Sequence, residues 1–334
     1  MLTDRGVFPD GYRGIDRSRP PKPTNLDELR QMLLRTRPSL SPSAFSEDIN
    51  RRANSEAKAM SSVVPIITGA KDNRLETEEN IQFNNLEKFA LGLKVAQPDK
   101  YYGARPEQVD ERIRRDLGQY IVPSTSTSLP VAPNFFFEGK SAGGRPDVAQ
   151  RQVMQDNAYG ARAMFQLQNY GKETPAYDGN AYTIGSSYHP GTGTLQMYST
   201  HPRQSTTGDT EYHMTQLDTY GMTGNIETFR RGAAAYRNAR DFAQEQRDRL
   251  ITQANFVARS ASTDVSSGKT DSMTGVSFAP LMANNSFGSD TSADELALHH
   301  SPSSDESDGK AHRRKRVAPA ASNRPRRKGP LGTL

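Results

Sequence analysis

Hydrophobic positions follow regular patterns between about residues 41 and 258 and lose them outside that range. Alternating or continuous apolar runs predict strands over 130–140, 181–188, 194–199 and 211–220. Apolar residues spaced three and four apart predict helices over 106–117, 147–170 and 225–257. The run Val63–Ile67 predicts a strand or an extended segment at a domain edge, because Pro65 cannot donate to a sheet ladder. These elements predict an α/β (α+β) fold with a mixed central sheet flanked by helices.

Both ends of the chain are poor in such patterns. Residues 1–40 are rich in Arg and Pro and predict a disordered arm, with one short helical candidate at Leu26–Leu34. Residues 259–334 are dominated by Ser, Thr, Gly, Asp and Asn, and they predict a disordered tail. We therefore expect a single folded domain over residues 41–258.

The composition excludes several kinds of functional site. The chain of 334 residues contains no cysteine, which excludes disulfide scaffolds, cysteine-ligated zinc and thiol catalysis. No apolar run approaches the ~18–20 residues that a membrane span needs, so we expect no membrane partner. No phosphate-binding glycine motif of the Walker type occurs, and we expect no organic cofactor. The arginines of the last helix alternate with acids, which predicts a solvated, salt-bridged face.

The net charge of +5 is concentrated at the end of the chain. Nine Lys and Arg and no Asp or Glu occur from Lys310 onward, which leaves 34 basic and 38 acidic residues elsewhere. Two basic clusters lie within 312–328 and are separated by seven uncharged residues. Such clusters predict nuclear localisation through an import receptor, with the cytoplasm as second choice. The eight residues of this predicted signal are Arg313, Arg314, Lys315, Arg316, Arg324, Arg326, Arg327 and Lys328.

The strand over 130–140 carries the candidate chemistry. Residues two apart on a strand face the same side, so Glu138 and Lys140 project together while Phe135 and Phe137 enter the core. Asp99 follows a proline and supplies a second carboxylate. Two acids suit a divalent cation such as Mg²⁺, and a lysine stabilises charge that develops on a phosphate. We therefore interpret Asp99, Glu138 and Lys140 as candidate catalytic residues for phosphodiester hydrolysis.

Residues 42–258 resemble a domain of filamentous-fungal proteins that is distantly similar to domains with a PD-(D/E)XK, or restriction-endonuclease-like, core. The matching pieces are Asn54-Ser55-Glu56, Pro98-Asp99-x-x-Tyr102-Gly103, Phe137-Glu138-Gly139-Lys140, Gly160-Ala161-Arg162 and the segment from Phe229 to Arg240. The resemblance implies a helix that carries Glu56, a mixed sheet that carries Asp99 and Glu138-x-Lys140, and the helix 147–170 on one face. It adds Glu56 to Asp99 and Glu138 as a candidate metal ligand, and it brings no activity of its own.

The spacing of the two acids leaves two functions open. Thirty-nine positions separate Asp99 from Glu138, and the predicted 106–117 helix must be an insertion between them. If the acids still meet, the chain is expected to be a nuclear, metal-dependent nuclease with nucleic acid as its partner. If they do not, it is a non-catalytic interaction or scaffold protein that retains the fold. Partner proteins and oligomeric state do not follow from the sequence.

Overall fold

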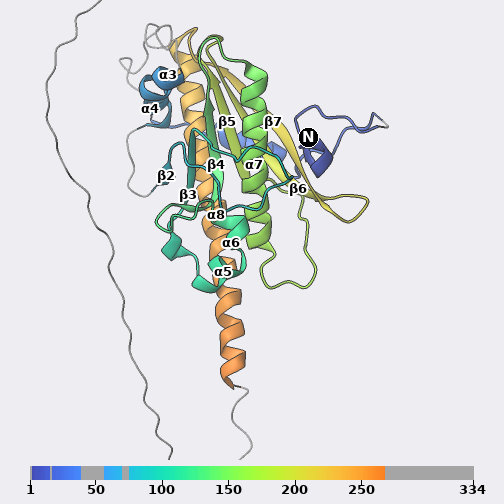
Figure 1. Cartoon of the computed structure of the whole chain (residues 1–334). Helices are drawn as coiled ribbons and strands as arrows, with labels where there is room; N and C mark the ends of the chain where they lie inside the picture. Colours follow the sequence, from blue (N-terminus) through green and yellow to red (C-terminus); the bar gives the residue numbers. More distant parts are fainter. Residues whose placement is uncertain (1, 16, 39–55, 70–74, 268–334) are drawn as a thin grey trace, which may run out of the picture. The chain divides into compact units, whose positions relative to one another are not determined.

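A computed structural model describes residues 2–15, 17–38, 56–69 and 75–267. The unit Met273–Leu334 lies outside the described residues, and with it both basic clusters of the predicted localisation signal. The described part forms a mixed sheet with a long helix on each face, which confirms the predicted fold class (Figure 1).

The sheet has seven strands in the order β1-β7-β6-β5-β4-β3-β2. Strand β4 pairs parallel with β5, and β1 pairs parallel with β7, whereas all other neighbours are antiparallel. The bounds are β1 Val7–Phe8, β2 Glu76–Glu78, β3 Lys100–Ala104, β4 Val131–Gly139, β5 Thr183–His189, β6 Thr194–Gln204 and β7 Thr210–Gly221. The four strands predicted from the alternation are therefore confirmed as β4 to β7.

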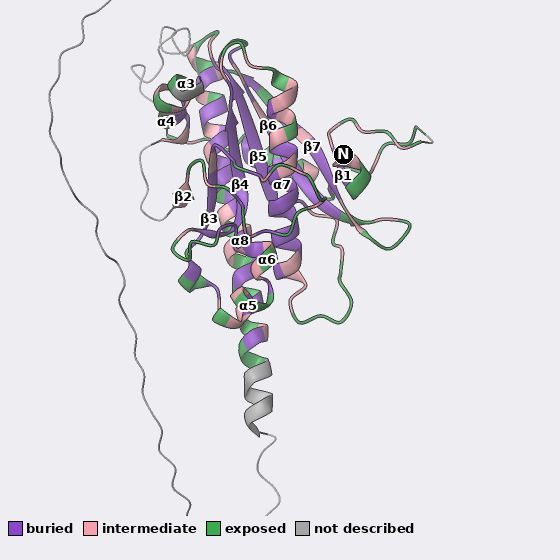
Figure 2. Cartoon of the chain, in the orientation of Figure 1, coloured by how far each residue is buried: buried purple, intermediate pink, exposed green. Residues whose placement is uncertain are grey.

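Two long helices, α7 (Pro146–Gln168) and α8 (Ile226–Ser267), cover the two faces of the sheet (Figure 1). Phe135 and Phe137 of β4 contact Tyr236 of α8, with ring centroids 5.0 and 5.9 Å apart. Phe136 faces α7, where a side chain at Gly160 would place its Cβ only 2.6 Å from the Phe136 ring. The strand β4 is buried along its whole length for this reason (Figure 2).

The N-terminal segment is not the disordered arm that its composition predicts. A 3₁₀ turn (Thr3–Arg5) leads into β1, which extends the sheet beside β7. Helix α1 (Leu26–Leu33) buries three apolar residues against the core: Leu29, Met32 and Leu33. The segment is rich in charged residues, so its composition does not reveal the short apolar face of α1. This face is stabilised by packing against α8, which is distant along the chain.

Two further local predictions are wrong. Val63–Ile67 belongs to a short helix, α4 (Val64–Thr68), instead of a strand. Pro65 fits the first turn of a helix, and Val64 and Ile67 are buried on the same side. The predicted 106–117 helix is divided into a 3₁₀ turn (Pro106–Gln108) and the helix α5 (Glu111–Asp116), because Asp110 caps a new helix start.

The remaining elements are α3 (Glu56–Ser62) and α6 (Gly118–Ile121). Helix α8 continues to Ser267, past the predicted start of the tail at residue 259. None of the helices in the described part is long and apolar enough to cross a membrane.

Candidate functional site

Asp99 and Glu138 meet where β3 begins and β4 ends. The two strands are antiparallel, and their register pairs Lys100 with Phe137. Asp99 directly precedes β3, and Glu138 is the penultimate residue of β4, so both acids lie at the same end of the pair. The 39 positions between them therefore do not separate the two side chains.

The insertion between the two acids lies at the opposite end of the strand pair. It contains α5 and α6 and connects the end of β3 at Ala104 with the start of β4 at Val131 (Figure 1). These helices pack against α7, α8 and β4, and Val109, Ile113 and Ile121 share one apolar cluster with residues of those three elements. The insertion therefore does not separate Asp99 from Glu138, and the two acids remain candidates for one metal site.

Short hydrogen bonds hold the acids and the lysine together. The Asp99 backbone N–H donates to Glu138 Oε1 (3.3 Å), and the Gly139 N–H donates to Asp99 Oδ2 (2.6 Å). Lys140 Nζ donates to the Gly139 carbonyl (2.6 Å) and lies 3.5 Å from Glu138 Oε2. Glu138 and Lys140 therefore share a face of the strand end, as the period of two predicts.

A third carboxyl, Asp156, completes the cluster from α7. Its carboxyl lies close enough to that of Glu138 for the two to influence each other's ionisation, and its Oδ2 atom is buried without a hydrogen-bond partner. Sequence analysis missed Asp156 because only the packing of α7 on β4 brings it to the site. The available signal was an acid three positions from both Val153 and Tyr159, which places it on an apolar face of the helix, and Asp156 is 2% exposed.

Burial raises the pKa of both central carboxyls. The pKa of Glu138 lies well above its usual range, because the group is buried and because Asp156 and Asp99 carry the same charge. Burial raises the pKa of Asp156 to about 7, and the Asp99 charge acts in the same direction. The buried carboxyls of Glu138 and Asp156 therefore favour a bound proton or a nearby cation over two negative charges.

The site is closed toward α3. Glu138 is 1% and Lys140 6% exposed. A Cβ on Gly139 would lie 2.9 Å from Met60 Sδ of α3, so the Met60 side chain packs directly over the Gly139 backbone. Glu56 is the first residue of α3, four positions before Met60, but its side chain lies outside the described part of the structure.

The residues present fit a divalent cation in donor type and in charge. Within the described residues, no three acids or histidines form a ready cage for a metal ion. Mg²⁺ does not need such a cage, because it is commonly held by one or two carboxylates and completes its shell with water and phosphate oxygens. The unpartnered Asp156 Oδ2 and the repulsion between the buried carboxyls of Glu138 and Asp156 are what a cation would satisfy.

Comparisons with protein-family models, with curated proteins and with solved structures give no match to this chain. The class of protein that the structure defines is therefore an α+β domain with a buried carboxylate–lysine cluster at the end of a strand pair.

Proposed function

We propose that this chain is a metal-dependent phosphodiesterase of the nuclease class, with Asp99, Glu138 and Lys140 at its active site. The observation that carries the proposal is the convergence of these three residues, from two strands, with Asp156 of α7. The resemblance to a PD-(D/E)XK core supports the choice of a nuclease over other metal-dependent phosphodiesterases. The basic clusters within 312–328 remain the basis for proposing nuclear localisation through an import receptor.

Asp99 and Glu138, assisted by Asp156, would hold Mg²⁺, with Glu56 as a further candidate ligand. The ion supplies Lewis-acid polarisation of the phosphate and lowers the pKa of a bound water. Lys140 lies beside Glu138 with its ammonium group held by the Gly139 carbonyl, which fixes the position of a positive charge. A cation at that position stabilises negative charge that develops on a phosphate oxygen.

The full chain is expected to cleave labelled single- or double-stranded DNA or RNA in Mg²⁺ or Mn²⁺. Glu138→Gln and Lys140→Met should each lower the cleavage rate by about a hundredfold or more, because they remove a ligand or a preorganised charge. Lys88→Met is the matched control, since Lys88 is an exposed lysine with no hydrogen bond or ion pair in the described part. Circular dichroism confirms that each variant is folded.

A second measurement separates metal binding from catalysis. Mg²⁺ that binds only the folded state raises the unfolding temperature, and the increase grows with the logarithm of the Mg²⁺ concentration above its Kd. This increase should be present in the wild type and absent in Glu138→Gln and Asp156→Asn. If the wild type neither cleaves nucleic acid nor gains stability from Mg²⁺ or Mn²⁺, the proposal is wrong.

The alternative is a non-catalytic interaction protein that keeps the fold. The burial of Glu138 and Lys140, and the contacts that they make with each other and with Gly139, favour it. In that case Glu138→Gln should relieve like-charge repulsion and stabilise the fold without any change in cleavage or in the response to Mg²⁺.

A further inference from the structure

A cavity rich in arginine lies on the outer side of α8, on the face of the sheet opposite to α7. It has a volume of about 260 Å³ and is bounded by residues 33–38, by Tyr220 of β7 and by the first three turns of α8. Among the described residues, five arginines and one acid, Glu227, line it. The arginines are Arg35, Arg37, Arg230, Arg231 and Arg237. The described lining of this cavity therefore carries an excess of positive charge.

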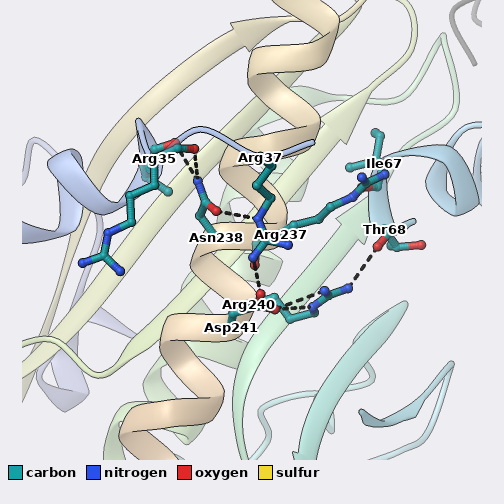
Figure 3. Close-up of polar contacts among 9 residues, drawn as sticks. Arg35, Arg37, Ile67, Thr68, Arg237, Asn238, Arg240 and Asp241 are labelled. Carbon is teal, nitrogen blue, oxygen red and sulfur yellow. Dashed lines mark hydrogen bonds and ion pairs between the residues drawn. The ribbon is translucent and has the colours of Figure 1, made fainter. Parts of the chain in front are cut away.

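Three arginines near the cavity are committed to holding its walls together (Figure 3). Arg237 donates from Nε to the Ile67 carbonyl (2.9 Å) and from Nη2 to the Ile66 carbonyl (2.7 Å). Arg37 bonds to Asn238 and to Asp241, and Arg240 bonds to the same Asp241 and to the Thr68 carbonyl. A single carboxylate, Asp241, thus serves two of these guanidinium groups, and the hydrogen bonds that the described residues give Arg237 go to backbone carbonyls.

The crowding of like charges is visible in the ionisation of Arg237. Its pKa is lowered by burial and then by the charges of Arg240 and Arg37. Arg35 lines the cavity as well, but its side chain extends away from Arg237 (Figure 3). The positive potential therefore comes from the arginines on α8 and from Arg37.

Arg230 and Arg231 are the groups placed to contact a ligand. They share one face of α8 with Glu227 and Ala234, because these positions are three or four apart. Arg231 is exposed, and its side chain has no hydrogen bond or ion pair among the described residues. Arg230 is partly exposed at the cavity wall and pairs with Glu227 at 3.0 Å, so it adds positive charge beside Arg231 while it already holds partners of its own.

We propose that this cavity binds a phosphate-bearing ligand, with the guanidinium groups of Arg230 and Arg231 as its main contacts. The planar fork of an arginine matches two phosphate oxygens, and two adjacent forks suit a phosphoryl group better than a carboxylate surface. Tyr220, Leu33 and Leu34 add an apolar wall that suits a sugar or a base next to the phosphate. The phosphate belongs either to a free mononucleotide-like compound or to a nucleic-acid backbone. The proposal does not depend on activity at Asp99 and Glu138.

The test measures binding of three probes to the full chain. Isothermal titration calorimetry is performed with inorganic phosphate and with adenosine 5′-monophosphate, and fluorescence anisotropy with a labelled dT12 oligonucleotide. Arg231→Gln and Arg230→Gln/Arg231→Gln are compared with Arg13→Gln/Arg115→Gln. The control pair lies outside the cavity, is exposed and removes the same net charge. The basic tail contributes equally to every protein in the series.

We expect the wild type and the control to bind alike and Arg230→Gln/Arg231→Gln to bind at least about tenfold more weakly, the effect of losing about one charge-assisted contact. A loss confined to phosphate and the mononucleotide supports a free ligand, and a loss confined to dT12 supports a backbone phosphate. The proposal is overturned if no probe binds the wild type, or if the arginine variants and the control bind every probe equally well.

Discussion

The carboxyl cluster around Glu138 and the arginine cluster on α8 both collect charges of one sign, but they compensate them differently. Asp99, Glu138 and Asp156 are buried beside one lysine, and burial raises the pKa of Glu138 and of Asp156. The arginines remain charged, because guanidinium does not lose its proton near neutral pH. Backbone carbonyls, Glu227 and one shared aspartate, Asp241, compensate their charges instead. The difference shows that burial and side-chain chemistry together decide whether a group among like charges changes its protonation or keeps its charge.

The largest expected effect comes from Lys140, the only lysine or arginine bonded to the carboxyls of the cluster within the described residues. Lys140→Met leaves the buried acids without their cation, and the free energy of unfolding should fall by about 3–5 kcal/mol at pH 8. Urea denaturation measures this change, with Lys88→Met as the control. If the free energy of unfolding fell by less than in the control, water would already screen the carboxyl charges. The two clusters would then compensate their charges in the same way.

The pair His201 and His213 tests the effect of burial on a base. Burial, followed by the charge of His213, lowers the pKa of His201 to about 4. In the unfolded chain the histidine has a pKa of about 6.5, so between pH 6.5 and pH 4 the unfolded state binds more protons than the folded state. The free energy of unfolding is therefore highest above this window and decreases as the pH falls through it. We expect a loss of up to about 3 kcal/mol across the window, a limit set by the pKa difference.

The control for this pH dependence is His201→Gln, which cannot titrate at that position. Its stability should follow a flatter curve between pH 6.5 and pH 4 than that of the wild type. Parallel curves would show that His201 does not carry the effect.

The contacts of Arg237 with α4 give an intermediate effect. Arg237→Gln removes the bonds to the Ile66 and Ile67 carbonyls, and the unfolding free energy should fall by about 1–3 kcal/mol, because these acceptors lose a charged donor. Chemical denaturation measures it against Arg249→Gln, an exposed arginine of the same helix. Equal stability of the two variants would mean that the carbonyls are satisfied by water.

The smallest effect is expected at Arg231. Since Arg231 is exposed and has no hydrogen bond or ion pair in the described part, Arg231→Gln should change stability by no more than about 0.5 kcal/mol. A thermal melt without phosphate checks this value. A larger loss would assign Arg231 to the wall of the cavity together with Arg237.

Much of the chemistry was predictable because it depends on short-range periodicity. The alternation along β4 places Glu138 and Lys140 on one face and Phe135 and Phe137 on the other, and the structure agrees. The prediction that all the arginines of the last helix form a solvated face is wrong for Arg240 and Arg247, which are 7% and 3% exposed. Arg247 reaches Asn134 of β4 at 2.8 Å, a contact for which local spacing offers no signal.

The sequence by itself determined the strands β4 to β7, the two long helices and the pairing of Glu138 with Lys140, because a period of two or of 3.6 decides which side chains share a face. The tertiary structure alone decided that Asp99 reaches Glu138 across an insertion, that Asp156 joins them and that residues 26–33 belong to the core. These outcomes depend on contacts between residues distant along the chain. Such contacts form only when the sheet register and the packing of α7 and α8 bring the partners together.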